Sequence, residues 1–121
     1  QINHREFHYR QLGHGVIWFD FVELCDSPRS QNDYLQLASE FHTLFISQVP
    51  QMSKTQDDQA RRFINLVDIC YEVNVKLMIS AAVQLPALYC GGSLDFAFQR
   101  TFSRLLEMQS QEYLARGHVI H

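Results

Sequence analysis

The stretch of residues 41–83 constrains the fold of this chain more than any other part of the sequence. Two apolar runs rich in strand-forming residues, at 44–49 and 75–81, flank an amphipathic segment with helical spacing over 57–73. A helix that joins two strands at this distance usually forms a right-handed crossover between parallel strands. The sequence therefore predicts a parallel strand–helix–strand unit, and with it an α/β domain.

A hairpin is predicted before this unit. Residues 7–11 and 16–22 read as strands on either side of a turn that contains Gly13 and Gly15. The second of these strands is almost continuously apolar, which is typical of a strand covered on both faces. We therefore expect a mainly parallel sheet with helices on both faces and an antiparallel hairpin at the amino end.

Further elements are predicted on either side of the central unit. Ser30 and Asp33 have the spacing of a capping box for a helix over 33–41. Apolar side chains at alternate positions favour a short strand over 94–101, and a last helix is expected over 103–115. The apolar side chains of that helix are expected either to join the core or to dock a partner.

Composition limits the class of protein. The 121 residues, 46% of them hydrophobic, fit a single α/β domain over residues 1–121. A formal net charge of −3 gives no general attraction to nucleic acid, which is not expected as a partner. Three cysteines without paired spacing, and the lack of a bilayer-spanning apolar run, favour a cytoplasmic location. Because the chain opens at Gln1 directly into strand-like sequence, we expect a piece of a longer protein.

Three motifs carry a resemblance to a known family. They are LC-x2-PRS-x2-DY at 24–34, ARRFI-x-LVD-x2-Y at 60–71 and F-x-RT-x-SRL-x-EMQS-x-EYL at 98–114. Together they resemble the carboxy-terminal part of the ZapE-type cell-division ATPases, an AAA+-type family with mitochondrial relatives. The resemblance extends over about residues 16–118.

The resemblance has implications for the parent protein. It implies ATP hydrolysis with bound ATP and Mg²⁺, through a P-loop and a Walker B strand that precede this segment. It implies a division-ring or other protein partner, and a cytoplasmic location that extends to the surface of the inner membrane. This segment is then expected to pack on the P-loop half of its own chain, and self-association is left open.

The chain itself lacks the residues that hydrolyse ATP. It has no G-x4-G-K-[ST] motif, because no Lys-Ser/Thr pair follows Gly13 and Gly15. The strand expected at 44–49 has the place of a Walker B strand but ends in Ser47 and Gln48, which carry no charge for Mg²⁺. We therefore expect a P-loop-NTPase-like half without the P-loop, inactive alone and without a tightly bound cofactor. The dispersed cysteines and histidines predict no metal site.

Arg29 and Ser30 form the first candidate binding site. Parallel strands would bring them to the carboxyl edge of the sheet, where open α/β sheets place their ligands. Arg29 would there meet a phosphate or the carboxylate of a partner. The alternative is a loop arginine bonded to nearby carbonyl groups.

Arg100 and Arg104, in the RTFSR sequence, form the second candidate site. In proteins of the AAA+ type, late arginines commonly sense the nucleotide or reach a neighbouring subunit's phosphate. The alternative is a structural ion pair, for example with Asp95 or Glu107.

Two functions remain open at this stage. In the first, the segment contributes arginines and partner surface to an ATPase, which the RTFSR arginines favour. In the second, it is a non-catalytic protein-interaction module with only architectural ancestry to nucleotide-binding domains, which the uncharged end of the strand at 44–49 favours.

Overall fold

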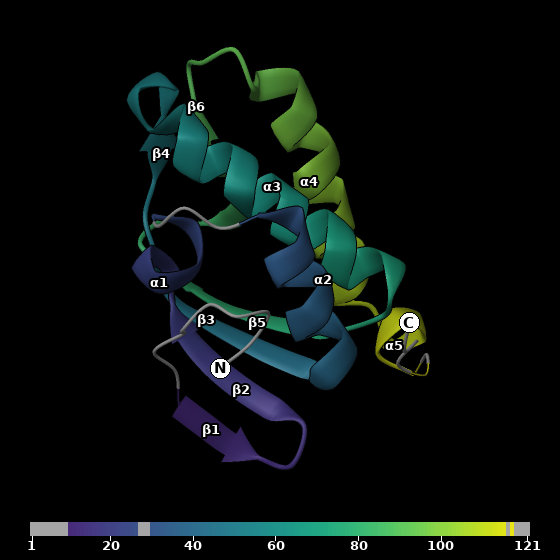
Figure 1. Ribbon diagram of the computed structural model, residues 1–121. Helices are drawn as coiled ribbons and strands as arrows, with labels where there is room; N and C mark the ends of the chain where they lie inside the picture. Colours follow the sequence, from purple (N-terminus) through teal and green to yellow (C-terminus); the bar gives the residue numbers. More distant parts are fainter. Residues whose placement is uncertain (1–9, 27–29, 116, 118–121) are drawn as a thin grey trace.

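The computed structural model describes residues 10–26, 30–115 and 117, and it is an α/β structure with one main sheet (Figure 1). Along the chain the elements are β1 (Arg10–Gly13), β2 (Val16–Asp20), α1 (Phe21–Cys25), α2 (Gln31–Glu40), β3 (Thr43–Val49), β4 (Met52–Ser53), η1 (Lys54–Gln56), α3 (Asp57–Glu72), β5 (Lys76–Ala81), η2 (Leu85–Ala87), β6 (Tyr89–Cys90), α4 (Asp95–Met108) and α5 (Gln111–Leu114).

The main sheet has the strand order β1-β2-β3-β5. β1 pairs with β2 as an antiparallel hairpin, whereas β2 with β3 and β3 with β5 are parallel pairs. The central β3–α3–β5 unit is therefore the predicted parallel crossover. An antiparallel hairpin is present as predicted, but its first strand reaches Gly13, and residues 7–9 of the predicted strand lie outside the described residues. A mainly parallel sheet flanked by helices is the arrangement expected of a P-loop-NTPase-like half.

The described helices lie on one side of the sheet (Figure 1). Ile17 and Leu44 meet Leu37 of α2 and Leu66 of α3 on that side, and the neighbouring β5 residue Leu77 faces α4. The strand order explains this, because the parallel crossovers step from β2 to β3 to β5 in one direction. Right-handed crossovers that keep one direction place their helices on one face. The expectation of helices on both faces is thus not met by the described residues.

α2 begins with the predicted capping box. The Asp33 amide donates to the Ser30 hydroxyl oxygen at 3.3 Å, and the Ser30 amide donates to Asp33 Oδ2 at 2.8 Å. One turn later, the buried Tyr34 hydroxyl donates to the Leu24 carbonyl oxygen at 2.5 Å. The cap and this hydrogen bond hold α2 against the end of α1.

Residues 94–101 are not a strand, so this prediction is wrong. The segment opens α4, and the side chains it buries follow helical spacing: Leu94, Phe98, Thr101, Leu105 and Met108. Phe96, which completed the apparent alternation, is 87% exposed. Alternation over three apolar residues was weaker than the helical period of the longer segment, which packs on α3.

β2 is also shorter than predicted. The strand ends at Asp20, and the apolar residues after it form the short helix α1 in place of the expected end of the strand. Phe21 and Leu24 are buried, whereas Val22 is 58% exposed. The continuous apolar run at 16–22 thus spans two elements, which periodicity alone could not divide.

α5 adds a buried side chain at the turn from α3 into β5. Tyr113 of α5 is fully buried, and its hydroxyl oxygen lies 3.1 Å from the Cys70 carbonyl oxygen and 2.8 Å from that of Val75. Leu105 and Met108 of α4 are buried as well. Of the two roles expected for the apolar side chains of the last helix, core packing is therefore the one these three residues have.

Candidate functional site

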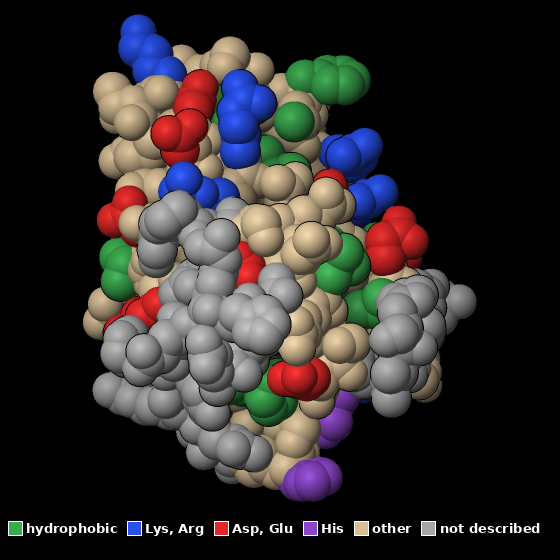
Figure 2. Space-filling view, in the orientation of Figure 1, with side chains coloured by type: hydrophobic (Ala, Val, Ile, Leu, Met, Phe, Trp, Pro, Cys, Tyr) green, Lys and Arg blue, Asp and Glu red, His purple; other side chains and the backbone are tan. Residues whose placement is uncertain are grey.

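The two arginines of the RTFSR sequence lie one turn apart on α4 and share a carboxylate on α3. Arg104 Nη1 donates to Asp68 Oδ1 at 2.6 Å, and Arg100 Nη2 lies 3.4 Å from Asp68 Oδ2. The structural ion pair considered from the sequence therefore exists, but its acid is Asp68 and not Asp95 or Glu107. Basic side chains gather over α3 and α4 in Figure 2.

Arg104 is held on a second side by an aromatic ring. Its guanidinium carbon lies 4.8 Å from the centroid of the Tyr71 ring, a cation–π geometry. The Tyr71 hydroxyl in turn lies 2.9 Å and 3.0 Å from the two carboxylate oxygens of Glu107. With 23% of its side chain exposed, Arg104 is a packing residue between α3 and α4.

Arg100 differs from Arg104 in exposure and in the length of its contact. Its side chain is 61% exposed, and its 3.4 Å contact to Asp68 is at the long end for a hydrogen bond. A guanidinium carries five N–H donors in a planar fork that matches phosphate and carboxylate. Arg100 therefore has donors that can meet an anion from outside this segment.

Of the candidate pair Arg29 and Ser30, the structure describes Ser30. Arg29 lies outside the described residues, so its proposed contact with a phosphate or carboxylate stays a prediction. Ser30 is the N-cap of α2, and its hydroxyl is also 3.2 Å from Asp33 Oδ2. The contacts described for Ser30 are thus those of a helix cap.

The carboxyl edge of the sheet carries a short hydrogen-bond chain. Trp18 Nε1 donates to the Ser47 hydroxyl oxygen at 2.8 Å, and that hydroxyl donates to Asp20 Oδ1 at 2.5 Å. Gln48, next along β3, has a φ of 60°, and the pairing of β3 with β5 shifts register between Ile46 and Val49. No local sequence pattern indicates these hydrogen bonds, because they depend on Ser47 lying beside Asp20 in the β2–β3 register.

The described residues fit an anion contact but not a magnesium site. Among them, no group of three or more His, Cys, Asp or Glu side chains could hold a metal ion. Asp20 is the acidic residue at the end of β2, and its neighbour on β3 is the uncharged Ser47. The pair of acids that a Walker B strand supplies to Mg²⁺ is thus missing from these two strand ends.

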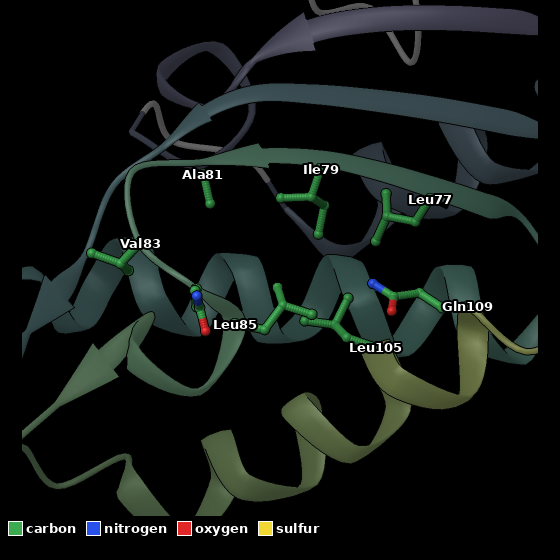
Figure 3. A pocket seen from close by; sticks show the side chains of 8 residues that line it. Leu77, Ile79, Ala81, Val83, Leu85, Leu105 and Gln109 are labelled. Atoms are coloured by element: carbon green, nitrogen blue, oxygen red, sulfur yellow. The ribbon is translucent and has the colours of Figure 1, made fainter.

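A hollow of about 280 Å³ lies between β5 and α4 (Figure 3). Leu77, Ile79 and Ala81 project into it from β5, and Leu105 faces them from α4. Its polar side chains are the amides of glutamine residues, and no charged side chain of a described residue lines it. Without a cation, this hollow does not suit the phosphates of a nucleotide.

Two of the cysteines, Cys25 and Cys70, are buried, and their thiols are poor nucleophiles. Burial raises the pKa of the Cys25 thiol and that of the Cys70 thiol to about 12 each. Because the thiolate is the nucleophile, neither side chain is reactive near neutral pH. The Cys25 carbonyl oxygen accepts from Arg62 Nη1 at 3.0 Å, which ties α1 to α3.

In the described part of the chain, no helix has the length and apolar character needed to cross a bilayer.

Comparison with known proteins identifies the family. The model of the AFG1-like ATPase family matches residues 1–117. This chain belongs to the AFG1-like ATPase family. It is 46% identical to the cell division protein ZapE of Escherichia coli K12 over 119 residues, which are 98% of this chain and 32% of that protein. It is 33% identical to lactation elevated protein 1 homolog B of Danio rerio over 129 residues, 80% of this chain and 26% of that protein.

The resemblance found in the sequence motifs is thus confirmed. This member of the AFG1-like ATPase family spans about a third of the length of the curated E. coli relative that it matches. No solved structure matches the chain. The family assignment therefore rests on sequence, and the arrangement of Arg100, Arg104 and Asp68 is read from this structure alone.

Proposed function

We propose that this chain is the carboxy-terminal module of a cell-division protein that binds and hydrolyses ATP. In this proposal the parent protein binds ATP and Mg²⁺ through a P-loop half outside this segment, and the module packs on that half. The family match and the 46% identity to E. coli ZapE support the proposal. The segment alone is inactive, because its own strand ends supply no acid pair.

The observation that carries the proposal is the difference between the two arginines of α4. Arg104 is fixed by Asp68 and by the Tyr71 ring, whereas Arg100 is 61% exposed beside the same carboxylate. We assign Arg100 to the contact with nucleotide phosphate, in its own or a neighbouring subunit. Arg104 and Asp68 hold α4 against α3, so that Arg100 is presented from a fixed position.

ATP turnover by the full-length protein tests this assignment. An arginine that stabilises the charge of the transferred phosphoryl group contributes roughly 10³-fold or more to kcat. We therefore expect Arg100→Ala to lower kcat by about that factor, with the folded structure intact by circular dichroism. Arg61→Ala, which removes an exposed arginine of α3, is the matched control and should keep the wild-type rate. A wild-type rate for Arg100→Ala contradicts the assignment.

The second candidate function is a non-catalytic protein-interaction module. The uncharged end of β3 at Ser47 and Gln48 favours it, as does Phe96, which is 87% exposed at the start of α4. A truncated parent that lacks this segment separates the two functions. Loss of turnover with an intact P-loop half supports the catalytic contribution, whereas an unchanged rate supports the interaction module.

Location and partners belong to the same proposal. We propose a cytoplasmic protein that reaches the surface of the inner membrane and acts on a division-ring or other protein partner. The name of the E. coli relative, a cell division protein, supports this assignment. Self-association is compatible with it, since a neighbouring subunit could then receive Arg100.

A further inference from the structure

The face of the sheet opposite the helices carries a row of large apolar side chains. Trp18 of β2, Phe45 of β3 and Met78 of β5 are successive partners in the strand register, so they lie side by side on that face. Met78 is 44% exposed, and Phe45 is half-buried. A shallow hollow of about 270 Å³ opens over the three side chains. The described helices cover the other face (Figure 1).

This face has the composition of an interface. Its centre is the aromatic and thioether row of Trp18, Phe45 and Met78, and Ser47 and Ser80 stand at the edge of the same hollow. An apolar centre with a polar margin, enriched in aromatic residues and Met, is typical of surfaces that bind protein. Phosphate and nucleic acid are disfavoured ligands, because no basic side chain among the described residues lines the hollow.

The topology adds an independent argument that this face is covered in the parent protein. All-parallel sheets occur almost only with both faces covered, and the three strands β2, β3 and β5 of this four-stranded sheet are parallel. Here the crossovers step from β2 to β3 to β5 in one direction, and the antiparallel β1 occupies the other edge. The described part of this segment therefore has no crossover helix for the second face, and the cover has to come from another stretch of chain.

The length of the relatives indicates which stretch of chain covers this face of the sheet. The match to E. coli ZapE takes up 98% of this chain but only 32% of that protein, so about two thirds of the relative lie outside the matched segment. A covalently attached domain is present at high effective concentration, which favours it over a free partner for an apolar face of this kind.

We propose that the face formed by Trp18, Phe45 and Met78 is the surface on which the P-loop half of the parent chain docks. The proposal deepens the proposed function and rests on it in one respect, the presence of that half in the same polypeptide. It leaves the opposite side, where Arg100 is exposed on α4, open to the nucleotide of a neighbouring subunit.

A photo-crosslinking residue at position 78 of the full-length protein tests the proposal. After irradiation, we expect a crosslink within one polypeptide to a peptide upstream of Gln1, with a yield that does not change on dilution. The same residue placed at Leu35 of α2, which is 42% exposed, is the matched control and should give no such product. A crosslink to residues 1–121, to a second copy, to an added partner or to nothing overturns the proposal.

The three methionines of the chain provide a second readout in the unmodified full-length protein. Met52 and Met108 are 0% and 3% exposed, whereas Met78 is 44% exposed in this segment. With the face covered, hydrogen peroxide should oxidise Met78 as slowly as the two buried methionines. Rapid oxidation of Met78 alone overturns the proposal. Neither the crosslink nor the oxidation of Met78 depends on ATP turnover. The docking proposal can therefore be contradicted while the ATPase assignment holds, and the ATPase assignment can be contradicted while the docking proposal holds.

Discussion

Arg104 of α4 and Asp68 of α3 form a 2.6 Å ion pair in which less than a quarter of each side chain is exposed. The pair joins two helices that also share the Arg104–Tyr71 cation–π contact. A half-buried charge pair with a second contact is more stabilising than an isolated surface ion pair, which contributes little. Asp68 thus determines how α4 lies on α3, and with it where Arg100 projects.

Asp68→Asn should lower the free energy of unfolding by about 1–2 kcal/mol, because both arginines of α4 lose their anionic partner. Urea-induced unfolding measures the change. Glu72→Gln, which neutralises an exposed acid at the end of α3, is the control and should change stability by no more than about 0.5 kcal/mol. Equal stabilities for the two variants would show that the charge pair does not hold the helices together.

Tyr113→Phe should destabilise the protein by about 1–2 kcal/mol, since the buried hydroxyl meets the carbonyl oxygens of Cys70 and Val75. These carbonyl groups flank the turn from α3 into β5. Hydrogen exchange should therefore accelerate at the amides of this turn. Tyr71→Phe removes a more exposed hydroxyl that contacts Glu107, and it should cost less. The reverse order of the two stabilities would contradict the assignment.

Ser30→Ala should cost about 1 kcal/mol, the usual loss for an N-cap side chain. The capping box with Asp33 is the physical reason, because the Asp33 amide loses its acceptor. Ser30→Thr keeps a hydroxyl at this position and should retain most of the stability. If Ser30→Ala also lowers ATP turnover of the full-length protein without a loss of stability, Ser30 has a binding role beyond the cap.

Local patterns allowed most of the sheet to be predicted, whereas contacts between distant residues were not accessible. The apolar, strand-forming run at 44–49 and the helical period over 57–73 are properties of neighbouring residues, and both elements exist. The prediction of a strand over 94–101 was wrong because three alternating apolar residues fit a strand as well as one turn of a helix.

The candidate site was predictable only as a set of residue types. The RTFSR sequence predicted Arg100 and Arg104 as candidate site residues. Their partner Asp68 lies 32 and 36 residues before them, and no spacing rule connects Asp68 on α3 with the two arginines on α4. The face formed by Trp18, Phe45 and Met78 was missed for a similar reason. Both faces of a parallel strand read as apolar whether a helix or another domain covers them, and the direction of successive crossovers appears only in the strand order.

Stability should fall at alkaline pH because of the two buried thiols. The pKa of Cys25 and that of Cys70 rise from an ordinary 9.0 to about 12 on folding, so the folded state keeps protons that the unfolded state releases above pH 9.0. The contribution of the thiols is complete below pH 9.0 and is lost progressively up to about pH 12, by at most about 1.4 kcal/mol per pH unit for each thiol.

Replacing both residues by Ala should flatten the dependence of unfolding free energy on pH in this range, whatever its effect at neutral pH. An unchanged slope in the double variant would show that the thiols do not titrate differently in the two states.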